Sequence, residues 1–146
     1  PVVTTPESPF EIGKAERMYS RDESHEKTVG IVSTGSLLYN ALQAAKELNE
    51  SGIGASVLHM ATIKPLDEEA LLAFAEEHQA IVTVEEHQVN GGLGGAVAEF
   101  LGENLPTTMK RVGVQDSFGE SGDPEELVAH FGMDTPAIVE AARQLV

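Results

Sequence analysis

Short runs of β-branched and aliphatic residues alternate along the chain with longer segments whose apolar residues recur every three or four positions. The short runs are typical of buried parallel strands and predict strands at residues 28–33, 55–59, 80–85 and 109–114. The longer segments predict five helices, whose apolar stripes span residues 38–48, 71–75, 96–101, 127–131 and 138–145. Strands that alternate with helices predict a three-layer α/β/α domain with a mostly parallel sheet of about five strands.

The beginning of the chain has a different pattern. Residues 1–9 contain three prolines and few core formers, which predicts an arm or linker that enters from something upstream. Residues 10–14 alternate apolar and polar positions with Phe10 and Ile12 on one face, so we expect an edge strand here that can run antiparallel. The folded domain is then expected over residues 10–146.

Capping residues mark the ends of several predicted helices. Gly35 or Ser36 is placed to cap the start of the first helix, and Gly52 lies just past its end. Asp123 followed by Pro124 and two glutamates is a strong start signal for the fourth helix.

Composition and charge narrow the function classes. With 9 basic and 24 acidic residues the chain has a net charge of −15, which disfavours nucleic acid or an anionic membrane surface as a partner. The absence of cysteine excludes disulfides, thiolate catalysis and zinc–thiolate sites, and it fits a reducing, cytoplasmic compartment. No apolar run of about 18 residues predicts a membrane span, and the first residues lack the pattern of a signal peptide.

The stretch of residues 80–102 carries the candidate chemistry. A buried strand ends in three polar residues, where open α/β sheets place ligand-facing groups, and a glycine turn and a helix follow. Glu85 and His87 share a face if the strand continues that far, whereas Glu86 points to the other side. The candidate site residues are Glu85, Glu86, His87, Gly91, Gly92, Gly94 and Gly95.

Several chemistries are open to this corner. The glycine turn could cradle a phosphate, but the dinucleotide fingerprint fails because Val97 stands at its third glycine position. The alternative is that small residues let the helix approach its strand or a second subunit closely. A carboxylate beside an imidazole could relay protons. We favour a polar contact in which Glu85 or Glu86 holds His87 at an interface.

Other polar residues suggest no site. We interpret Lys64 and Arg111 as surface cations, although either could meet an anion. Ser117 and Ser121 lack the pattern of a nucleophile elbow. The remaining histidines are scattered and are interpreted as solvated or core residues, without the spacing of metal ligands: His25, His59, His78 and His130.

Six motifs in fixed order resemble a known family. They are FEIGKA (10–15), IVSTGSLLYNAL (31–42), TIKPLD (62–67), VTVEEHQVNGGLGGAVAE (82–99), KRVGVQDSFGESGDPEEL (110–127) and FGMDTPAIVEAA (131–142). Over roughly residues 8–146 the chain closely resembles the C-terminal domain of the transketolase family, and most of all the second chain of transketolases encoded as two chains. Pyruvate dehydrogenase beta subunits and deoxyxylulose-phosphate synthases share the domain, but His87 and the FGESGDPEEL run look more like transketolase.

The resemblance implies an enzyme that uses thiamine diphosphate and magnesium to move two-carbon ketol units between sugar phosphates. In the family these cofactors are held by other domains, through a G-D-G motif and an essential glutamate that have no counterpart here. The resemblance therefore implies no catalytic, cofactor-binding or metal-ligating residue in this chain.

The expected function is assembly. The resemblance implies a dimerisation domain that is inactive alone, whose partners are the thiamine-diphosphate-binding domains or chain of the same enzyme in a homodimer. The alternative is a regulatory module that takes an anionic metabolite at the glycine turn, residues 91–95.

Overall fold

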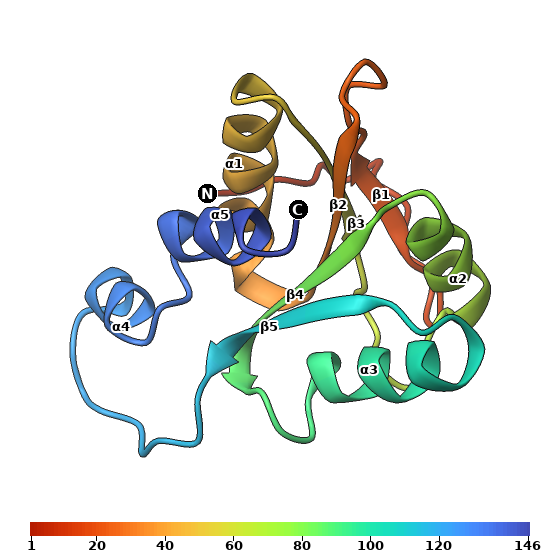
Figure 1. Cartoon of the computed structure of the whole chain (residues 1–146). Coiled ribbons are helices and arrows are strands. Elements are labelled where there is room, and N and C mark those ends of the chain that lie inside the picture. Colours follow the sequence, from red (N-terminus) through yellow and green to blue (C-terminus); the bar gives the residue numbers. More distant parts are fainter.

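The computed structural model describes residues 1–146 and places a five-stranded sheet between two layers of helices (Figure 1). The strands are β1 (Glu16–Tyr19), β2 (Lys27–Ser33), β3 (Ile53–His59), β4 (Ala80–Gln88) and β5 (Thr108–Val114). The helices are the short 3₁₀ helix η1 (Gly35–Leu37), α1 (Leu38–Glu50), α2 (Glu68–Glu76), α3 (Leu93–Asn104), α4 (Pro124–His130) and α5 (Thr135–Arg143). The strand order is β1-β3-β2-β4-β5, with only β1 antiparallel. The predicted three-layer α/β/α fold is confirmed.

Each face of the sheet buries its own hydrophobic core. Helices α1 and α5 cover one face, where the alternate positions Val29 and Ile31 of β2 point toward them. Helices α2 and α3 cover the other face, which receives Val32. Because β2 is covered on both sides, its residues after Lys27 are all buried, as expected for a central parallel strand.

The path of the chain creates a switch point between β2 and β4. From β2 the chain crosses through α1 to β3 on one side, whereas α3 leads from β4 to β5 on the other side. The carboxyl ends of β2 and β4 are therefore adjacent, and the N–H of Thr34 donates to the carbonyl of Val84 at 3.1 Å. Open α/β sheets present their functional groups at such a point.

The edge strand forms later in the chain than the sequence pattern predicted. Residues 10–14 are not a strand: Phe10 and Ile12 are 74% and 71% exposed, and Gly13 has a φ of 83°, which interrupts extended backbone. The antiparallel edge strand is β1, in which Glu16 pairs with His59 of β3. It forms there because Met18 and Tyr19 pack against the core beside α1.

Helix caps match the sequence predictions in part. Asp123 caps α4 by accepting the N–H of Glu125 at 3.0 Å, and Gly52 follows α1 with a φ of 88°, as predicted. The predicted cap of α1 is wrong: η1 precedes it, and neither Gly35 nor Ser36 caps the helix. The hydroxyl of Ser36 instead donates to the carboxylate of Glu86. None of the helices has the length and apolar character needed to cross a membrane.

Candidate functional site

The candidate corner lies at the carboxyl end of β4, directly at the switch point. Strand β4 continues to Gln88, so Glu85, Glu86 and His87 alternate between the two faces of the sheet. A Cβ atom placed on Gly92 would meet both the carboxylate of Glu85 and the ring of His87, which confirms that these two side chains share the face toward α3. Glu86 points to the opposite face and reaches Ser36 at the start of the η1–α1 segment.

The carboxylate of Glu85 caps the first turn of α3. Glu85 is 1% exposed, and its two oxygens accept the N–H groups of Leu93 and Gly94, each at 2.7 Å. Gly92 stands at the N-cap position and has no side chain to satisfy these donors. The carboxylate also places a negative charge at the positive end of the helix dipole. The glycine turn is therefore built around an anion that the chain itself provides.

The glycines of the turn have different tasks. A Cβ atom at Gly92 would lie 2.8 Å from Cδ of Glu85, and one at Gly94 would lie 2.8 Å from Oγ1 of Thr83, so both positions require close packing. Gly91 adopts a φ of 85°, and a Cβ atom at Gly95 would meet nothing within 4 Å. Close approach of the helix to its strand therefore explains Gly92 and Gly94, whereas Gly95 faces open space.

The structure argues against an anion site in the glycine turn, because the N–H donors that would bind the anion are already used. Two N–H groups at the start of α3 are already bound by Glu85, and its buried carboxylate would repel a phosphate in the same place. The diphosphate of thiamine diphosphate does not fit this corner for the same reason. No group of three or more His, Cys, Asp or Glu side chains elsewhere is arranged to hold a metal ion.

Glu86 and His87 are both exposed near the carboxyl end of β4. Within this chain Glu85 is bound to α3 and Glu86 to Ser36, and neither is hydrogen-bonded to His87, so the contact of His87 at an interface stays a prediction. His87 instead lies with Nδ1 2.8 Å from the carbonyl oxygen of Gln88, and a carbonyl can only accept, so Nδ1 carries the hydrogen. The Nε2 atom of His87 has no protein partner and is accessible to another molecule.

Two side chains that the sequence did not assign to this corner hold it in place, one of them Arg111, which was interpreted as a surface cation. The guanidinium of Arg111 donates from Nη1 to the carbonyl of Val89 at 2.9 Å, and its aliphatic part lies over Gly94. The amide of Gln88 donates to the carbonyl of Ser117 at 2.8 Å, which ties the β5–α4 loop to β4. Both contacts join segments more than 20 residues apart, so no local sequence pattern predicts them.

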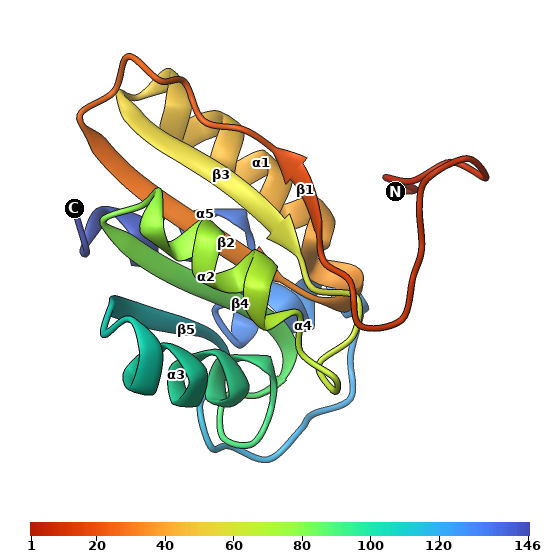
Figure 2. The same cartoon turned by 90° about the vertical axis from the view of Figure 1, so that its right-hand side faces the viewer.

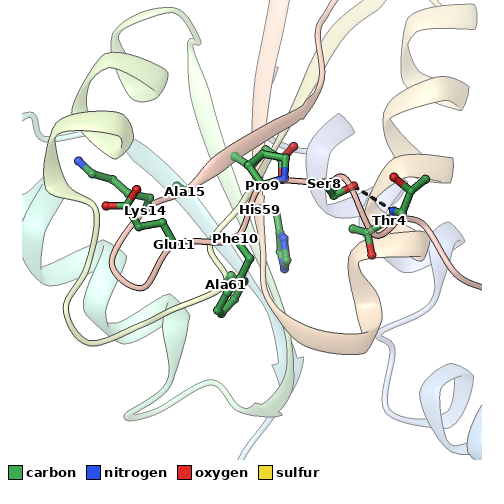
Figure 3. Close-up of a pocket in the computed structure, with 11 residues that line it drawn as sticks. Thr4, Ser8, Pro9, Phe10, Glu11, Lys14, Ala15, His59 and Ala61 are labelled. Carbon is green, nitrogen blue, oxygen red and sulfur yellow. Dashed lines mark hydrogen bonds between the residues drawn. The ribbon is translucent and has the colours of Figure 1, made fainter.

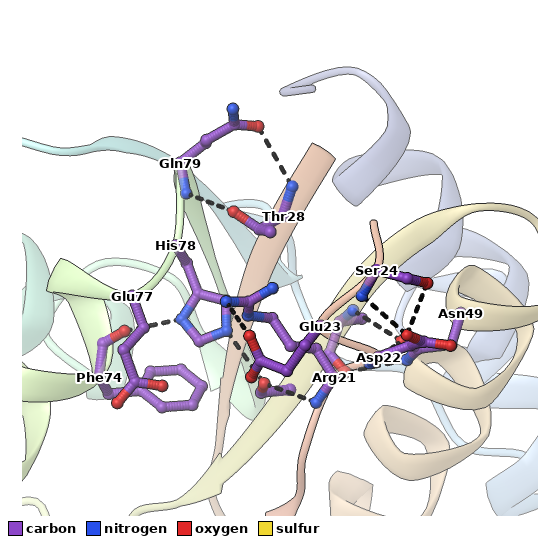
Figure 4. Close-up of polar contacts among 12 residues, drawn as sticks. Arg21, Asp22, Glu23, Ser24, Thr28, Asn49, Phe74, Glu77, His78 and Gln79 are labelled. Carbon is purple, nitrogen blue, oxygen red and sulfur yellow. Dashed lines mark hydrogen bonds and ion pairs between the residues drawn. The ribbon is translucent and has the colours of Figure 1, made fainter. Parts of the chain in front are cut away.

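A buried polar cluster lies at the opposite, amino end of the sheet (Figure 4). His78 is 7% exposed, donates from Nδ1 to the carbonyl of Phe74 at 2.7 Å, and accepts the hydroxyl of Ser56 at Nε2 at 3.0 Å. The same hydroxyl accepts the N–H of Arg21 at 3.0 Å. Burial lowers the pKa of His78 against the opposing effect of the Phe74 carbonyl, so the neutral ring is favoured. This histidine is a core residue, as predicted.

A hollow of about 400 Å³ lies beneath the N-terminal arm, beside the end of β3 (Figure 3). His59 lines it together with Lys14 and Glu11, and hydroxyls of the arm complete the wall. Partial burial lowers the pKa of His59, and the carboxylate of Glu16 opposes that effect. The lining mixes both charge signs and holds no pair of side chains in hydrogen-bond contact across the space, so it defines no reaction centre.

Comparison with known proteins places this geometry in context. The family model described as "Transketolase, C-terminal domain" matches residues 19–138. The subunit SqwH of 6-deoxy-6-sulfo-D-fructose transketolase from Clostridium sp. (strain MSTE9) is 46% identical over 136 residues, which cover 93% of this chain and 41% of that protein. A putative transketolase C-terminal section from Methanocaldococcus jannaschii is 40% identical over 135 residues, covering 92% of this chain and 40% of the relative.

The same domain is found in longer enzymes and in a solved structure. A 1-deoxy-D-xylulose-5-phosphate synthase from Synechococcus sp. is 42% identical over 136 residues, covering 92% of this chain and 20% of that enzyme. A solved structure described as "Split gene transketolase, inactive beta4 tetramer" superposes with a TM-score of 0.91 and 41% identity, over 99% of this chain and 46% of that one. The chain thus spans less than half the length of these relatives.

Proposed function

Because the chain belongs to the transketolase C-terminal domain family, we propose that it is the assembly domain of a thiamine-diphosphate-dependent transketolase. The complete enzyme would transfer two-carbon ketol units between sugar phosphates, with thiamine diphosphate and magnesium held outside this chain. The names of two relatives support this proposal, since one is a transketolase subunit and the other a transketolase C-terminal section.

The observation that carries the proposal is the use of Glu85. At the switch point the glycine turn offers the N–H groups at the start of α3, and the chain fills this place with its own buried carboxylate. A domain that bound a diphosphate there would leave those donors free. The corner is therefore built for rigidity, with Glu86 and His87 presented outward for contact.

The partners follow from the same proposal. The chain would bind the thiamine-diphosphate-binding domains or chain of its enzyme and form a homodimer in the cytoplasm. The similar split-gene transketolase is described as an inactive β4 tetramer. That description supports a chain of this kind that associates and yet needs more than itself for catalysis.

Gly91 and Gly95 are the members of the turn that could serve such an association. A side chain at Gly95 would enter open space, so this position can change without disturbing the packing of α3 on β4. A bulky residue there, as in Gly95→Phe, should weaken association in sedimentation experiments if α3 lies at the subunit contact. The same substitution at Gly94 would strike Thr83 and Arg111 and test the fold instead.

Cofactor binding tests the proposed function directly. Calorimetry of the isolated chain with thiamine diphosphate and magnesium should give no binding, and the chain alone should have no transketolase activity. Addition of the thiamine-diphosphate-binding part of the enzyme should restore activity with sugar-phosphate donors and acceptors. Micromolar affinity of the isolated chain for the cofactor would contradict the proposal.

A further inference from the structure

Six large hydrophobic side chains remain exposed, and each lies either before β1 or on a segment that follows a parallel strand. They are Val2, Phe10, Ile12, Tyr39, Ile63 and Phe118. Three precede β1, with Val2 in the N-terminal arm and Phe10 and Ile12 just after it, and the others stand on the segments that follow β2, β3 and β5. Figure 2 shows the arm, the β3–α2 loop and the β5–α4 loop along the carboxyl ends of the parallel strands. The connections at the amino ends carry no exposed large hydrophobic side chain.

Phe118 is the most exposed of these side chains and stands on an anchored loop. It is 97% exposed, at residues 115–123 between β5 and α4. The neighbouring carbonyl of Ser117 accepts the amide of Gln88, and the amide of Gln115 donates to the carbonyl of Gly113 at 3.2 Å. A phenyl ring that a fixed loop holds in water contributes no burial free energy to the isolated chain. Aromatic side chains of this kind contribute much of the binding free energy when they are buried at interfaces.

The same side of the molecule is acidic. Exposed carboxylates surround Phe118 in the sequence, and Glu86 lies at the end of the adjoining strand β4: they are Glu86, Asp116, Glu120, Asp123, Glu125 and Glu126. The exposed cations of this edge are Arg111, whose guanidinium is bound to the carbonyl of Val89, and Lys14 and Lys64, which lie on the far side near β1 and β3. A complementary partner would therefore present apolar side chains together with lysine or arginine.

We propose that this carboxyl edge binds the thiamine-diphosphate-binding part of a transketolase-type enzyme, with Phe118 as its aromatic anchor; the inference rests on the proposed function. The curated relatives are more than twice as long as the matched stretch, and the matched family is described as a C-terminal domain, so their remaining length precedes it. In such a relative the preceding part connects through the segment equivalent to the arm, which leaves the body on this edge (Figure 2). The apolar and acidic surface therefore lies on the same edge as the connection to the preceding part of the enzyme, which is placed to cover it.

The test uses the complete enzyme with three variants of this chain. Phe118→Ser should loosen association between this chain and the thiamine-diphosphate-binding part roughly 10- to 100-fold, as for an aromatic anchor. Glu120→Lys should loosen it in a salt-dependent manner. Glu50→Lys makes the same charge change at the opposite end of the sheet, at the end of α1, and should leave association unchanged. All three positions are exposed, so melting temperature and circular dichroism should confirm that the variants are folded.

Hydrogen exchange locates the contact independently of the variants. Amides of residues 86–92 and 115–123 should gain protection when the thiamine-diphosphate-binding part is added, and amides of residues 20–26 and 105–107 should not. If activity is restored but Phe118→Ser and Glu120→Lys associate like the parent, the proposed function stands and the edge assignment is overturned. If the two parts never associate, the proposed function itself fails. Concentration-dependent protection of residues 115–123 in the isolated chain would identify a second copy as the occupant and overturn the proposal.

Discussion

The carboxylate of Glu85 fills the space that a side chain at Gly92 would need: a Cβ atom at residue 92 would overlap Oε2 of Glu85 and lie 2.8 Å from its Cδ. The same Oε2 accepts the N–H of Leu93 at 2.7 Å, so it cannot move aside without losing a buried hydrogen bond. The missing side chain at Gly92 and the buried carboxylate at Glu85 are therefore one structural device that fixes α3 on β4.

Gly92→Ala should destabilise the fold because the added methyl group displaces this carboxylate. We expect a loss of about 1–3 kcal/mol in the free energy of unfolding, the usual range for overpacking in a filled core. Urea denaturation of the isolated chain measures it. Gly95→Ala is the matched control: Gly95 lies in the first turn of α3, three residues after Gly92, with open space around it, and the substitution should be neutral or stabilising by up to about 1 kcal/mol. Equal effects of the two substitutions would contradict the role given to Gly92.

Removal of the carboxylate should cost stability of similar size. Glu85→Ala leaves the N–H groups of Leu93 and Gly94 buried without a partner, and each such group costs about 1–3 kcal/mol. Glu86→Ala removes an exposed carboxylate next in sequence and should change stability by less than about 0.5 kcal/mol. Amide exchange in the first turn of α3 should accelerate only in the Glu85 variant. Unchanged exchange there would show that water replaces the cap.

Stability should fall as the solution becomes acidic, because of His78. Burial lowers the pKa of His78 below its ordinary value of 6.5. Below pH 6.5 the unfolded chain therefore binds a proton that the folded chain refuses, until the lower folded-state pKa is passed. The stabilising contribution is complete above pH 6.5 and is lost as the pH falls through this window, with a slope of at most about 1.4 kcal/mol per pH unit for one site.

The contribution of His78 can be separated from that of other groups. His59 also has a lowered pKa, so it adds to the same acid sensitivity. His78→Gln should flatten the pH dependence of the melting temperature between pH 7.5 and 5.5 relative to the parent chain. His130→Gln, on an exposed turn of α4, serves as the control for losing one histidine. A pH dependence that survives His78→Gln in full would exclude this origin.

His87 should matter in the assembled enzyme and not in the isolated chain. Its side chain is exposed, and its one hydrogen bond within the chain is to the carbonyl of the next residue, so His87→Ala should leave the stability of the isolated chain within about 0.5 kcal/mol. In the complete enzyme the same change should weaken assembly by about 1–3 kcal/mol if a buried polar partner loses its hydrogen bond. Turnover per assembled dimer and melting temperature are to be compared. A hundredfold loss of turnover with intact assembly would show that His87 reaches the active site.

Local patterns determined the layers of this protein. The alternation of short β-branched runs with helical stripes predicted four of the five strands and all five longer helices. These patterns can be recognised in the sequence because a central strand such as β2 must be apolar on both faces, whereas a covering helix such as α5 must be apolar on one face only. Asp123 and Gly52 marked helix ends because capping depends on backbone groups only a few residues away.

The sequence also placed the candidate corner, but only the tertiary structure decided how it is used. The pattern brought two carboxylates, a histidine and four glycines together at the end of β4, and it left a phosphate cradle, a proton relay and a polar contact open. The direction of each side chain depends on where β4 ends and on what α3 brings close. Glu85 turned out to be the cap of α3, and Glu86 the partner of Ser36, 50 residues earlier.

The edge strand shows the same limit. Phe10 and Ile12 have the alternation of a strand, yet residues 16–19 form it, because an edge strand is selected by what it pairs with. Residues 16–19 pair with the free backbone edge of β3, and Met18 and Tyr19 pack against the core beside α1. The alternation within residues 10–14 contains no information about which segment pairs with β3. Sequence periodicity reports which side of an element is buried, whereas pairing, hydrogen-bond partners and the surface left uncovered depend on contacts between distant segments. Those contacts exist only after the chain has folded.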